Sequence, residues 1–377
     1  MHTPIKLPES PDLSHFPNSL PPPHRLARRS FLRSLGLGAA LFSPGTAILA
    51  KSMMPSSMMS RSHDHEPHSM LNSGDIAILR FLAAAELIET DLWQQYTELA
   101  SVSSTYQDAL EQLDGDMPQY IADNTDDELS HATFLNAFLS ANGAAPVNLE
   151  PFRTLPGSSA TGSSNVLRLT NLSQLNVDTS WYLRYRSSLN PDFGATFPQF
   201  INIVNFPTIP GTDLPAGDEI QAIANAAGFH FAAIEQGGTS LYATMALKAS
   251  SLTVLQIIAG IGGAEVVHFA IWHDKAGNAP AVSFGGVVFP DLTTFNGDES
   301  RQTNLIMPEP CTFIDPSLPE CSVIRPGTTP HSGAVAAATA LTNSNLFMGQ
   351  SPQFFDTLNA LAQAADAARR IPEGPKK

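Results

Sequence analysis

Two Glu-x-x-His pairs are the residues of this chain best suited to chemistry. They are Glu128 with His131 and Glu265 with His268. Residues three apart on a helix project from one face, with Cβ atoms about 5–6 Å apart, so the carboxylate and imidazole of a pair can reach the same ion. Each pair is therefore predicted to bind one metal ion.

A lone helical glutamate precedes each pair, Glu86 in the first half of the chain and Glu235 in the second. Two Glu-x-x-His helices and one glutamate from each of two further helices form the ligand set of a dinuclear carboxylate site in a four-helix bundle. The charges balance, because four carboxylates offset two divalent ions, whereas four buried carboxylates without partners would be costly. The six predicted metal ligands are Glu86, Glu128, His131, Glu235, Glu265 and His268.

Four helices must position these side chains. Apolar residues that recur in alternating steps of three and four predict helices over 75–100, 117–141, 218–249 and 253–276, with the ligands on the apolar stripes. Gly260, Gly262 and Gly263 in the last of them would let a neighbouring helix approach closely. On the first stripe Glu86 and Glu89 both face inward, so the pattern alone leaves open which is the ligand.

An aromatic residue follows each lone glutamate by seven positions. Trp93 follows Glu86, and Tyr242 follows Glu235, so each half of the chain reads glutamate, aromatic, then Glu-x-x-His. This weak internal repeat suits a two-fold dimetal site. Trp93 and Tyr242 are candidates for a catalytic role in relaying electrons, and packing in the core is the alternative.

The chain resembles the ferritin-like domain family, which includes plant desiccation-related proteins and exported bacterial proteins. Residues 85–93 and 234–242 and the two Glu-x-x-His helices carry the resemblance, which covers about residues 71–280. It implies an all-α, ferritin-like four-helix bundle with one long crossover, and two divalent ions, iron or manganese. It also favours Glu86 over Glu89, because the aromatic seven residues later matches the wider ferritin-like pattern. Bridging ligands would be Glu128 and either Glu235 or Glu265.

The start of the chain resembles a twin-arginine export signal. Arg28 and Arg29 open the run Arg-Arg-Ser-Phe-Leu-Arg, and a glycine- and alanine-rich apolar run of about 17 residues extends to Ala50. A membrane anchor is the alternative, but a span needs about 20 apolar residues. We therefore expect residues 1–50 to be a signal peptide. The protein would then be periplasmic or secreted, and the twin-arginine machinery would be its partner during transport.

Composition fits an exported protein with a sizeable core. Hydrophobic residues make up 43% of the chain and charged residues 15%, and the formal net charge is −15. Such acidity argues against nucleic acid, which favours basic surfaces. The expected partners are metal ions and small oxidants, and a homodimer is compatible with the sequence.

The remaining segments are appendages to the predicted bundle at 73–278. Residues 51–72 are rich in Met and His and could take up a transition metal, although a disordered linker is the commoner role. Residues 142–217 are too long for a simple turn and sit where ferritin-like topology expects its one long crossover. Residues 279–377 are expected to be irregular, with a strand-like run at 282–289 and a final helix at 352–370 that docks on the bundle.

Two cysteines, Cys311 and Cys321, lie ten apart in a proline-rich loop of that last segment. In an oxidising compartment a local disulfide is expected. A redox-active pair is the alternative, but a Cys-x-x-Cys spacing and a basic environment are both missing.

The function that these features favour is handling of oxidants by a dimetal site, that is, peroxide or oxygen and metal redox chemistry in stress protection. The protein would then be a dimetal oxidoreductase of catalase or oxidase type. The alternative is a non-enzymatic desiccation- or stress-related protein that binds metal structurally or not at all. Retention of all six ligands favours the first, because a scaffold has no need to keep buried charges.

Overall fold

The computed structural model describes residues 71–371, apart from 103, 184–197, 296–307, 309, 312–313 and 324–331. Every described residue belongs to one compact unit, His65–Lys377. The predicted export signal and nearly all of the Met- and His-rich linker lie outside the described residues.

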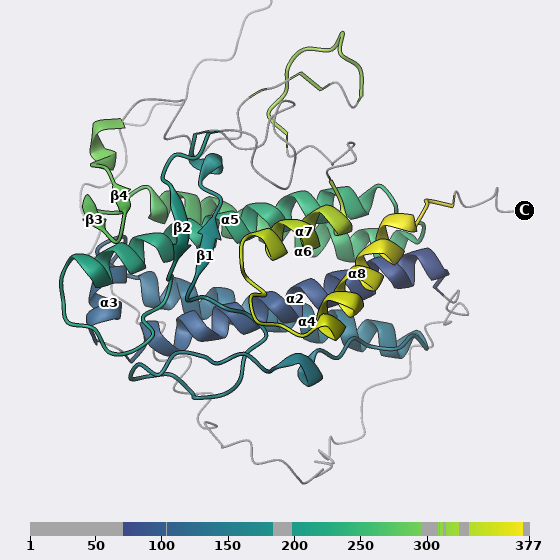
Figure 1. Ribbon diagram of the computed structural model, residues 1–377. Helices are drawn as coiled ribbons and strands as arrows, with labels where there is room; N and C mark the ends of the chain where they lie inside the picture. The colour runs from purple at the N-terminus through teal and green to yellow at the C-terminus, as the bar shows by residue number, and fades with distance from the viewer. Residues whose placement is uncertain are drawn as a thin grey trace, which may run out of the picture. The chain divides into compact units, whose positions relative to one another are not determined.

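Four long helices form the bundle (Figure 1). They are α2 (Ser73–Ala100), α4 (Met117–Ala141), α5 (Asp218–Ala246) and α6 (Leu252–Ala276). The most extensive packing is within the pairs α2 with α4 and α5 with α6. The predicted all-α fold is confirmed, since the strands of the described part are only three or four residues long.

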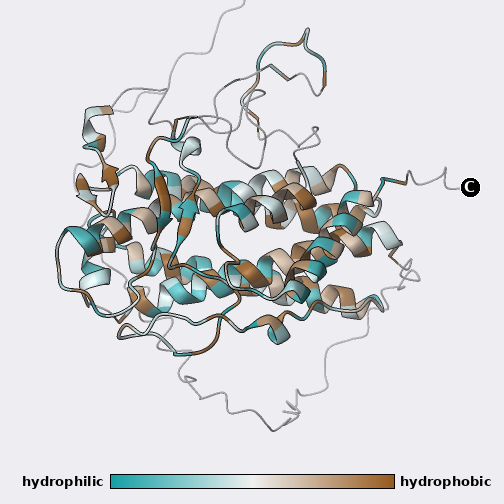
Figure 2. Cartoon of the chain, viewed as in Figure 1, coloured by the Kyte–Doolittle hydropathy of each residue, from teal (hydrophilic) through white to brown (hydrophobic). Residues whose placement is uncertain are grey.

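The apolar stripes of these helices form the core. Leu82 and Trp93 of α2, Leu135 of α4, Phe231 of α5 and Ile258 of α6 are almost completely buried. Figure 2 shows apolar and polar residues interspersed along each bundle helix, as expected for helices with one face in a core and one in solvent. Burial of this stripe orients the acidic residues that interrupt it.

The ends of α2, α5 and α6 are tied together by one buried carboxylate. Asn72 caps α2 by accepting a hydrogen bond from the Asp75 N–H, and Asp75 itself accepts from the backbone N–H groups of Ser250 and Ser251, each at 2.9 Å. Ser251 in turn caps α6. This connection explains why α5 ends at Ala246, three residues before the predicted end: the backbone that follows is held by Asp75.

The crossover between α4 and α5 carries little regular structure. Its strands β1 (Leu175–Val177) and β2 (Ile203–Phe206) pair antiparallel, and two 3-10 helices, Glu150–Phe152 and Ser180–Tyr182, precede and follow β1. The part at 184–197 lies outside the described residues.

Asp91 of α2 anchors this crossover to the bundle. Its buried carboxylate accepts hydrogen bonds from the N–H groups of Leu169 at 3.0 Å and Thr170 at 2.9 Å, and from the Thr170 hydroxyl at 2.7 Å. Arg153 forms an ion pair with the same carboxylate. A charge-assisted set of this kind is stronger than neutral hydrogen bonds, so one side chain fixes a long irregular segment.

The apolar run at 282–289 is a hairpin, where the sequence predicted a single strand-like run. Strands β3 (Val282–Phe284) and β4 (Val287–Phe289) pair antiparallel. Gly285 and Gly286 form the turn with φ of 59° and 87°. A two-residue hairpin turn needs positive φ at both positions, which glycine adopts at little cost.

A 3-10 helix, Leu292–Phe295, and three shorter α-helices complete the described part: α3 (Ser104–Glu111), α7 (Ala334–Asn343) and α8 (Pro352–Ala367). Helix α8 packs on α2 and α7 and ends three residues before the predicted position. The Asp366 carboxylate accepts hydrogen bonds from the N–H groups of Ala334 and Val335 at the start of α7, at 3.0 and 2.8 Å. It also pairs with Lys248 after α5 at 2.7 Å, so α7 is held to both α8 and the bundle.

Cys311 and Cys321 are not joined in this structure, and the disulfide expected in an oxidising compartment stays a prediction. Cys311 is buried, whereas Cys321 is exposed. The two residues thus lie in different environments. Residues 312–313, between them, lie outside the described residues.

Helix α6 is long and apolar enough to cross a membrane by length and composition, and a third of its most apolar stretch is buried inside the protein. It packs along α5, and its Glu265 and His268 are buried. In this structure α6 is therefore a helix of the bundle.

One of the three glycines of α6 allows a close helix approach. A Cβ at Gly262 would lie 2.8 Å from Tyr242 Cβ, whereas a Cβ at Gly260 or Gly263 would meet nothing within 4 Å. The expected role in close approach thus belongs to Gly262 alone.

This difference predicts that alanine substitutions at Gly260 and Gly262 change the free energy of unfolding in opposite directions. Gly260→Ala should raise the free energy of unfolding by about 0.5–1 kcal/mol, because alanine loses less backbone entropy in a helix. Gly262→Ala should lower it, because the new methyl group collides with Tyr242. Urea unfolding followed by circular dichroism measures both. Equal changes in the two variants would contradict the assigned packing.

Candidate metal centre

The structure brings the six predicted ligands together in two overlapping groups. The first contains Glu86, Glu128, His131 and Glu265, and the second contains Glu128, Glu235, Glu265 and His268. Within each group one ligand atom per residue lies within 4.8 Å of all the others. Ligands at about 2.0–2.2 Å from an ion lie up to about 4 Å apart, so each group is close to the size of one ion's coordination shell.

His131 faces the first group through Nδ1. This atom lies 3.3 Å from Glu86 Oε2, 3.1 Å from Glu128 Oε2 and 3.5 Å from Glu265 Oε1. The helical spacing of three places Glu128 and His131 side by side on α4, and the bundle brings the other two carboxylates from α2 and α6.

His268 faces the second group, again through Nδ1. This atom lies 3.0 Å from Glu128 Oε1 and 3.4 Å from Glu235 Oε2. The other ring nitrogen, Nε2, lies 3.1 Å from Asp127 Oδ2. A carboxylate on the second nitrogen fixes the ring orientation and tautomer of a metal-binding histidine. Asp127 was not predicted, although its position directly before Glu128 could have suggested it.

The two groups share Glu128 and Glu265. Both side chains are completely buried, and each contributes to both halves of the cluster. If an ion were bound in each group, these two carboxylates, one from each Glu-x-x-His pair, would be able to contact both ions. Glu235, the other expected candidate for a bridge, belongs to the second group only.

Unsatisfied polar atoms show that this cluster fits a cation. Among the described residues, five buried atoms of the cluster make no well-directed hydrogen bond: Glu86 Oε2, Glu235 Oε2, Glu265 Oε1, Glu265 Oε2 and His268 Nδ1. Four of them lie 3.0–3.5 Å from an oppositely charged atom of the cluster, and Glu265 Oε2 has no ion-pair neighbour there. A buried charged oxygen without a partner is costly. A divalent cation would satisfy all of them, because oxygen and imidazole nitrogen are its ordinary ligands.

Protons on the carboxyl groups and imidazoles neutralise the cluster when no metal ion is bound. Burial raises the pKa of Glu86 to about 8, against a hydrogen bond from His131. Burial and then the Glu128 charge raise the pKa of Glu265 well above its usual value. Burial alone would also raise the pKa of Glu128, but hydrogen bonds from His131 and His268 hold it at about 2. The acids therefore differ in charge state although they share one site.

The pKa values of both histidines are also raised, which for an imidazole favours the charged form. Burial disfavours the imidazolium of His131, but hydrogen bonds to Glu128 and Glu86 outweigh it and raise the pKa to about 10. For His268 the charge of Glu235 and the hydrogen bond to Glu128 outweigh burial and raise the pKa to about 12. Without metal, the cluster thus holds protons where ions would bind.

Glu89 lies beside the cluster without joining it. It belongs to neither group of ligands, which agrees with the choice of Glu86. Burial, followed by the charges of Glu128, Glu86 and Glu235, raises the pKa of Glu89 well above its usual value. Its Oε2 is buried and has no hydrogen-bond partner among the described residues.

Asn124 is a functional residue that the sequence did not reveal. Its side-chain amide donates to Glu128 Oε1 and to Glu235 Oε1, each at 3.0 Å, and its oxygen accepts from Trp272 Nε1 at 2.9 Å. It holds carboxylates from two helices in position. Its place on the predicted stripe, four residues before Glu128, was the available signal.

The two candidate aromatics occupy different positions. Tyr242 donates a hydrogen bond to Glu86 Oε1 and so touches a ligand directly. Trp93 is fully buried and stacks on Trp272, with ring centroids 5.2 Å apart and planes at 23°. Trp272 leads through Asn124 to the carboxylates, so Trp93 reaches the cluster only through a stack of neighbours.

A model of the ferritin-like domain family matches residues 74–278, more than half of the 377 residues. The chain belongs to the ferritin-like domain family. The matched segment of this ferritin-like protein contains all six predicted ligands. No curated protein and no solved structure matches the chain. In a ferritin-like domain, a buried cluster of glutamates and histidines indicates divalent metal binding.

The protonated histidines give a prediction about metal uptake. An ion must take the Nδ1 lone pairs of His131 and His268, so binding should release about two or more protons at neutral pH. Affinity should rise with pH, because protons compete for the same atoms. Titration of Mn²⁺ into metal-free protein in weak buffer with a pH-sensitive dye measures the release. Uptake without proton release would contradict these protonation states.

A second prediction concerns Asn124. Asn124→Leu removes both amide hydrogen bonds to the ligands and should weaken metal binding about 10–100-fold, the usual effect of losing a group that orients ligands. Competition with a chelator measures the affinity. Gln119→Leu, at an exposed position of the same helix, is the control and should bind metal like the unaltered protein. Unchanged affinity of the Asn124 variant would show that the amide does not position the ligands.

Proposed function

We propose that this ferritin-like protein holds two divalent ions, iron or manganese, and handles small oxidants such as peroxide or oxygen. The observation that carries the proposal is the pair of overlapping ligand groups that share Glu128 and Glu265. A single structural ion at either group would leave one histidine and at least one buried carboxylate outside its coordination shell. Two ions use all six side chains.

The donor set favours metals that change oxidation state in biology. It consists of carboxylate oxygens and imidazole nitrogens, and neither cysteine belongs to it. Such hard and intermediate ligands suit manganese and iron, whereas thiolates would favour zinc or copper(I). When bound, a pair of such ions supplies electron exchange with oxygen or peroxide.

The residues around the site support that chemistry. Tyr242 is 2% exposed and hydrogen-bonded to Glu86, so it can orient this carboxylate and move a proton at Oε1. Trp272, which is hydrogen-bonded to Asn124, and Trp93, which stacks on Trp272, are both buried and exclude bulk water from this side of the site. A dry, shaped surrounding limits side reactions of a redox metal.

Export by the twin-arginine route completes the proposal. Its support is the Arg28–Arg33 run and the apolar segment that follows. Copper and zinc bind nitrogen and oxygen ligands more tightly than manganese or iron. Folding around the metal before transport to the periplasm would protect the weaker-binding ion from replacement.

The test is metal content together with activity. Protein isolated from the extracytoplasmic fraction should contain about two iron or manganese ions per chain and should consume peroxide or oxygen. Mainly zinc or copper, or no stoichiometric metal, would contradict the proposal. Two bound ions without either activity would leave the non-enzymatic role as the better account.

A double variant locates the site. Glu128→Ala with Glu265→Ala removes both shared carboxylates and should abolish metal binding and activity. Asp126→Ala, which removes an exposed carboxylate from the same helix as Glu128, should leave both unchanged. Full metal content in the double variant, measured by elemental analysis, would place the ions elsewhere.

A further inference from the structure

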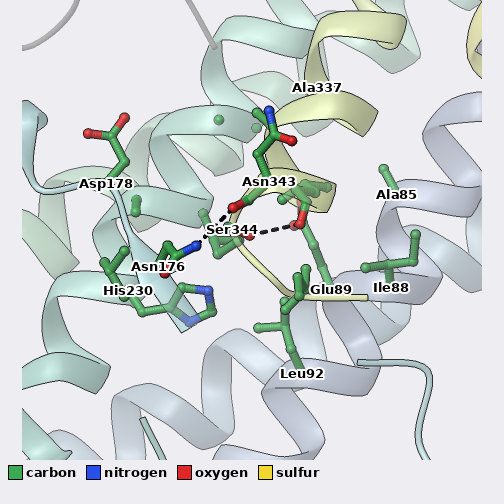
Figure 3. Close-up of a pocket in the computed structure, with 18 of the residues that line it drawn as sticks. Ala85, Ile88, Glu89, Leu92, Asn176, Asp178, His230, Ala337, Asn343 and Ser344 are labelled. Carbon is green, nitrogen blue, oxygen red and sulfur yellow. Dashed lines mark hydrogen bonds between the residues drawn. The ribbon is translucent and has the colours of Figure 1, made fainter. Parts of the chain in front are cut away.

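A cavity of about 300 Å³ lies beside the metal centre. Its walls come from α2 and α5 of the bundle, from the β1 and β2 region of the crossover, and from α7 with the residues after it (Figure 3). Four segments of the chain, from α2 near its start to α7 near its end, therefore line one space. The volume is at the lower end of the range for small-molecule sites.

Most of the cavity wall is apolar. Phe81, Ile88 and Leu92 contribute from α2, Leu241 from α5 and Leu341 from α7. Such a wall favours an apolar occupant through burial of its surface.

The polar residues at one side of the cavity are largely occupied with each other. The Asn176 side chain donates to the Asn343 carbonyl at 3.1 Å, and its backbone N–H donates to the Ser344 carbonyl at 2.9 Å (Figure 3). These hydrogen bonds hold the crossover against α7. The Asn176 amide and the two carbonyls that it bonds are thus already paired, so other residues must pair with an occupant of the cavity.

Two polar atoms of the lining residues have no partner. Glu89 Oε2 and His230 Nε2 are both buried and make no hydrogen bond within the described part of the chain. Figure 3 shows both side chains among those that line the cavity. Buried polar atoms in an apolar wall are costly unless something in the cavity pairs with them.

Hydrogen bonds behind His230 decide what its free nitrogen can do. His230 Nδ1 lies 2.8 Å from the Tyr96 hydroxyl, which lies 2.6 Å from Thr208 Oγ1. Thr208 Oγ1 donates to the Leu172 carbonyl at 3.2 Å, and a carbonyl can only accept. Tyr96 then donates to Thr208, and His230 donates from Nδ1 to Tyr96.

That order leaves Nε2 of a neutral imidazole as an acceptor. Burial keeps the ring neutral, since it lowers the pKa of His230 to about 3. The cavity therefore presents an acceptor that requires an O–H or N–H donor from its occupant.

The cavity also adjoins the metal ligands. Gly238 lines it, and a Cβ at this position would lie 2.3 Å from Glu265 Oε2, so only the Gly238 backbone separates the two spaces there. Glu89, on another wall, interacts electrostatically with Glu86, Glu128 and Glu235. An occupant would sit next to the side chains that are the candidate metal ligands.

We propose that this cavity binds a small, largely apolar molecule that carries a hydroxyl group, and that the hydroxyl donates to His230 Nε2. Binding follows from the cavity itself. That the bound molecule is a substrate of the metal centre rests on the proposed function.

The test compares 1-naphthol with naphthalene, which has the same rings and lacks the hydroxyl. Both are titrated into the metal-loaded full chain under nitrogen, with binding followed by fluorescence. 1-Naphthol should bind about tenfold more tightly, as expected for one hydrogen bond to an unpaired buried acceptor. In His230→Phe this preference should disappear while naphthalene still binds. Equal affinities in the unaltered protein, or a preference that survives in His230→Phe, would overturn the proposal.

A pair of neighbouring variants on α7 places the molecule in the cavity. Ala340 lines the cavity, whereas Thr339 is exposed and does not. Ala340→Phe should weaken 1-naphthol binding at least tenfold, and Thr339→Phe, which adds the same ring one position away, should leave it unchanged. Undiminished binding in Ala340→Phe would show that 1-naphthol binds elsewhere and would overturn the proposal.

Metal analysis of the same samples separates the two proposals. About two ions per chain without 1-naphthol binding would refute the cavity and leave the dimetal site standing. Binding that depends on His230 and Ala340 in protein that takes up no iron or manganese would support the cavity as a binding site and refute the dimetal function.

Discussion

Burial of several carboxylates in one small space is the constraint on which this structure depends. Glu86, Glu128, Glu235 and Glu265 are at most 1% exposed, and like charges at this distance in a dry interior repel strongly. Positive charge must therefore be present, as imidazolium and carboxyl protons or as metal ions. The bundle is arranged to make the second solution possible: ligands arrive from four helices, and Asn124 and Asp127 orient them. The same constraint links the folded state, the protonation state and the metal content of the protein.

The sequence was informative about this centre because its parts repeat with helical spacing. The stripes that contain Glu86, Glu128, Glu235 and Glu265 follow the 3.6-residue period, and periodicity of this kind survives in any tertiary context. Glu86 and Glu89 could not be separated in this way, because both lie on the inward face. Which of the two is a ligand depends on the tilt and rotation of α2 against its neighbours, and only packing determines these.

Other features could not be predicted because they arise from contacts between distant residues. Helix α7 begins at Ala334, whose N–H donates a hydrogen bond to the carboxylate of Asp366, 32 residues later in the sequence. The crossover is fixed by Asp91, which in sequence is one more polar residue of a helix. The hairpin at 282–289 was hidden by its apolar strands, although its two glycines were a visible turn signal. The cavity has no local sequence signature, since four separate segments form it.

The division of the cavity wall has an evolutionary consequence. All six candidate ligands lie within the segment that matches the ferritin-like domain family, whereas Ala337, Ala340 and Leu341 of the cavity wall lie beyond it, on α7. Selection can thus alter the shape of the chamber by changing a stretch of the gene that contributes nothing to ion coordination. If the proposed binding holds, substitutions on α7 would change which molecules fit the cavity without changing any candidate metal ligand.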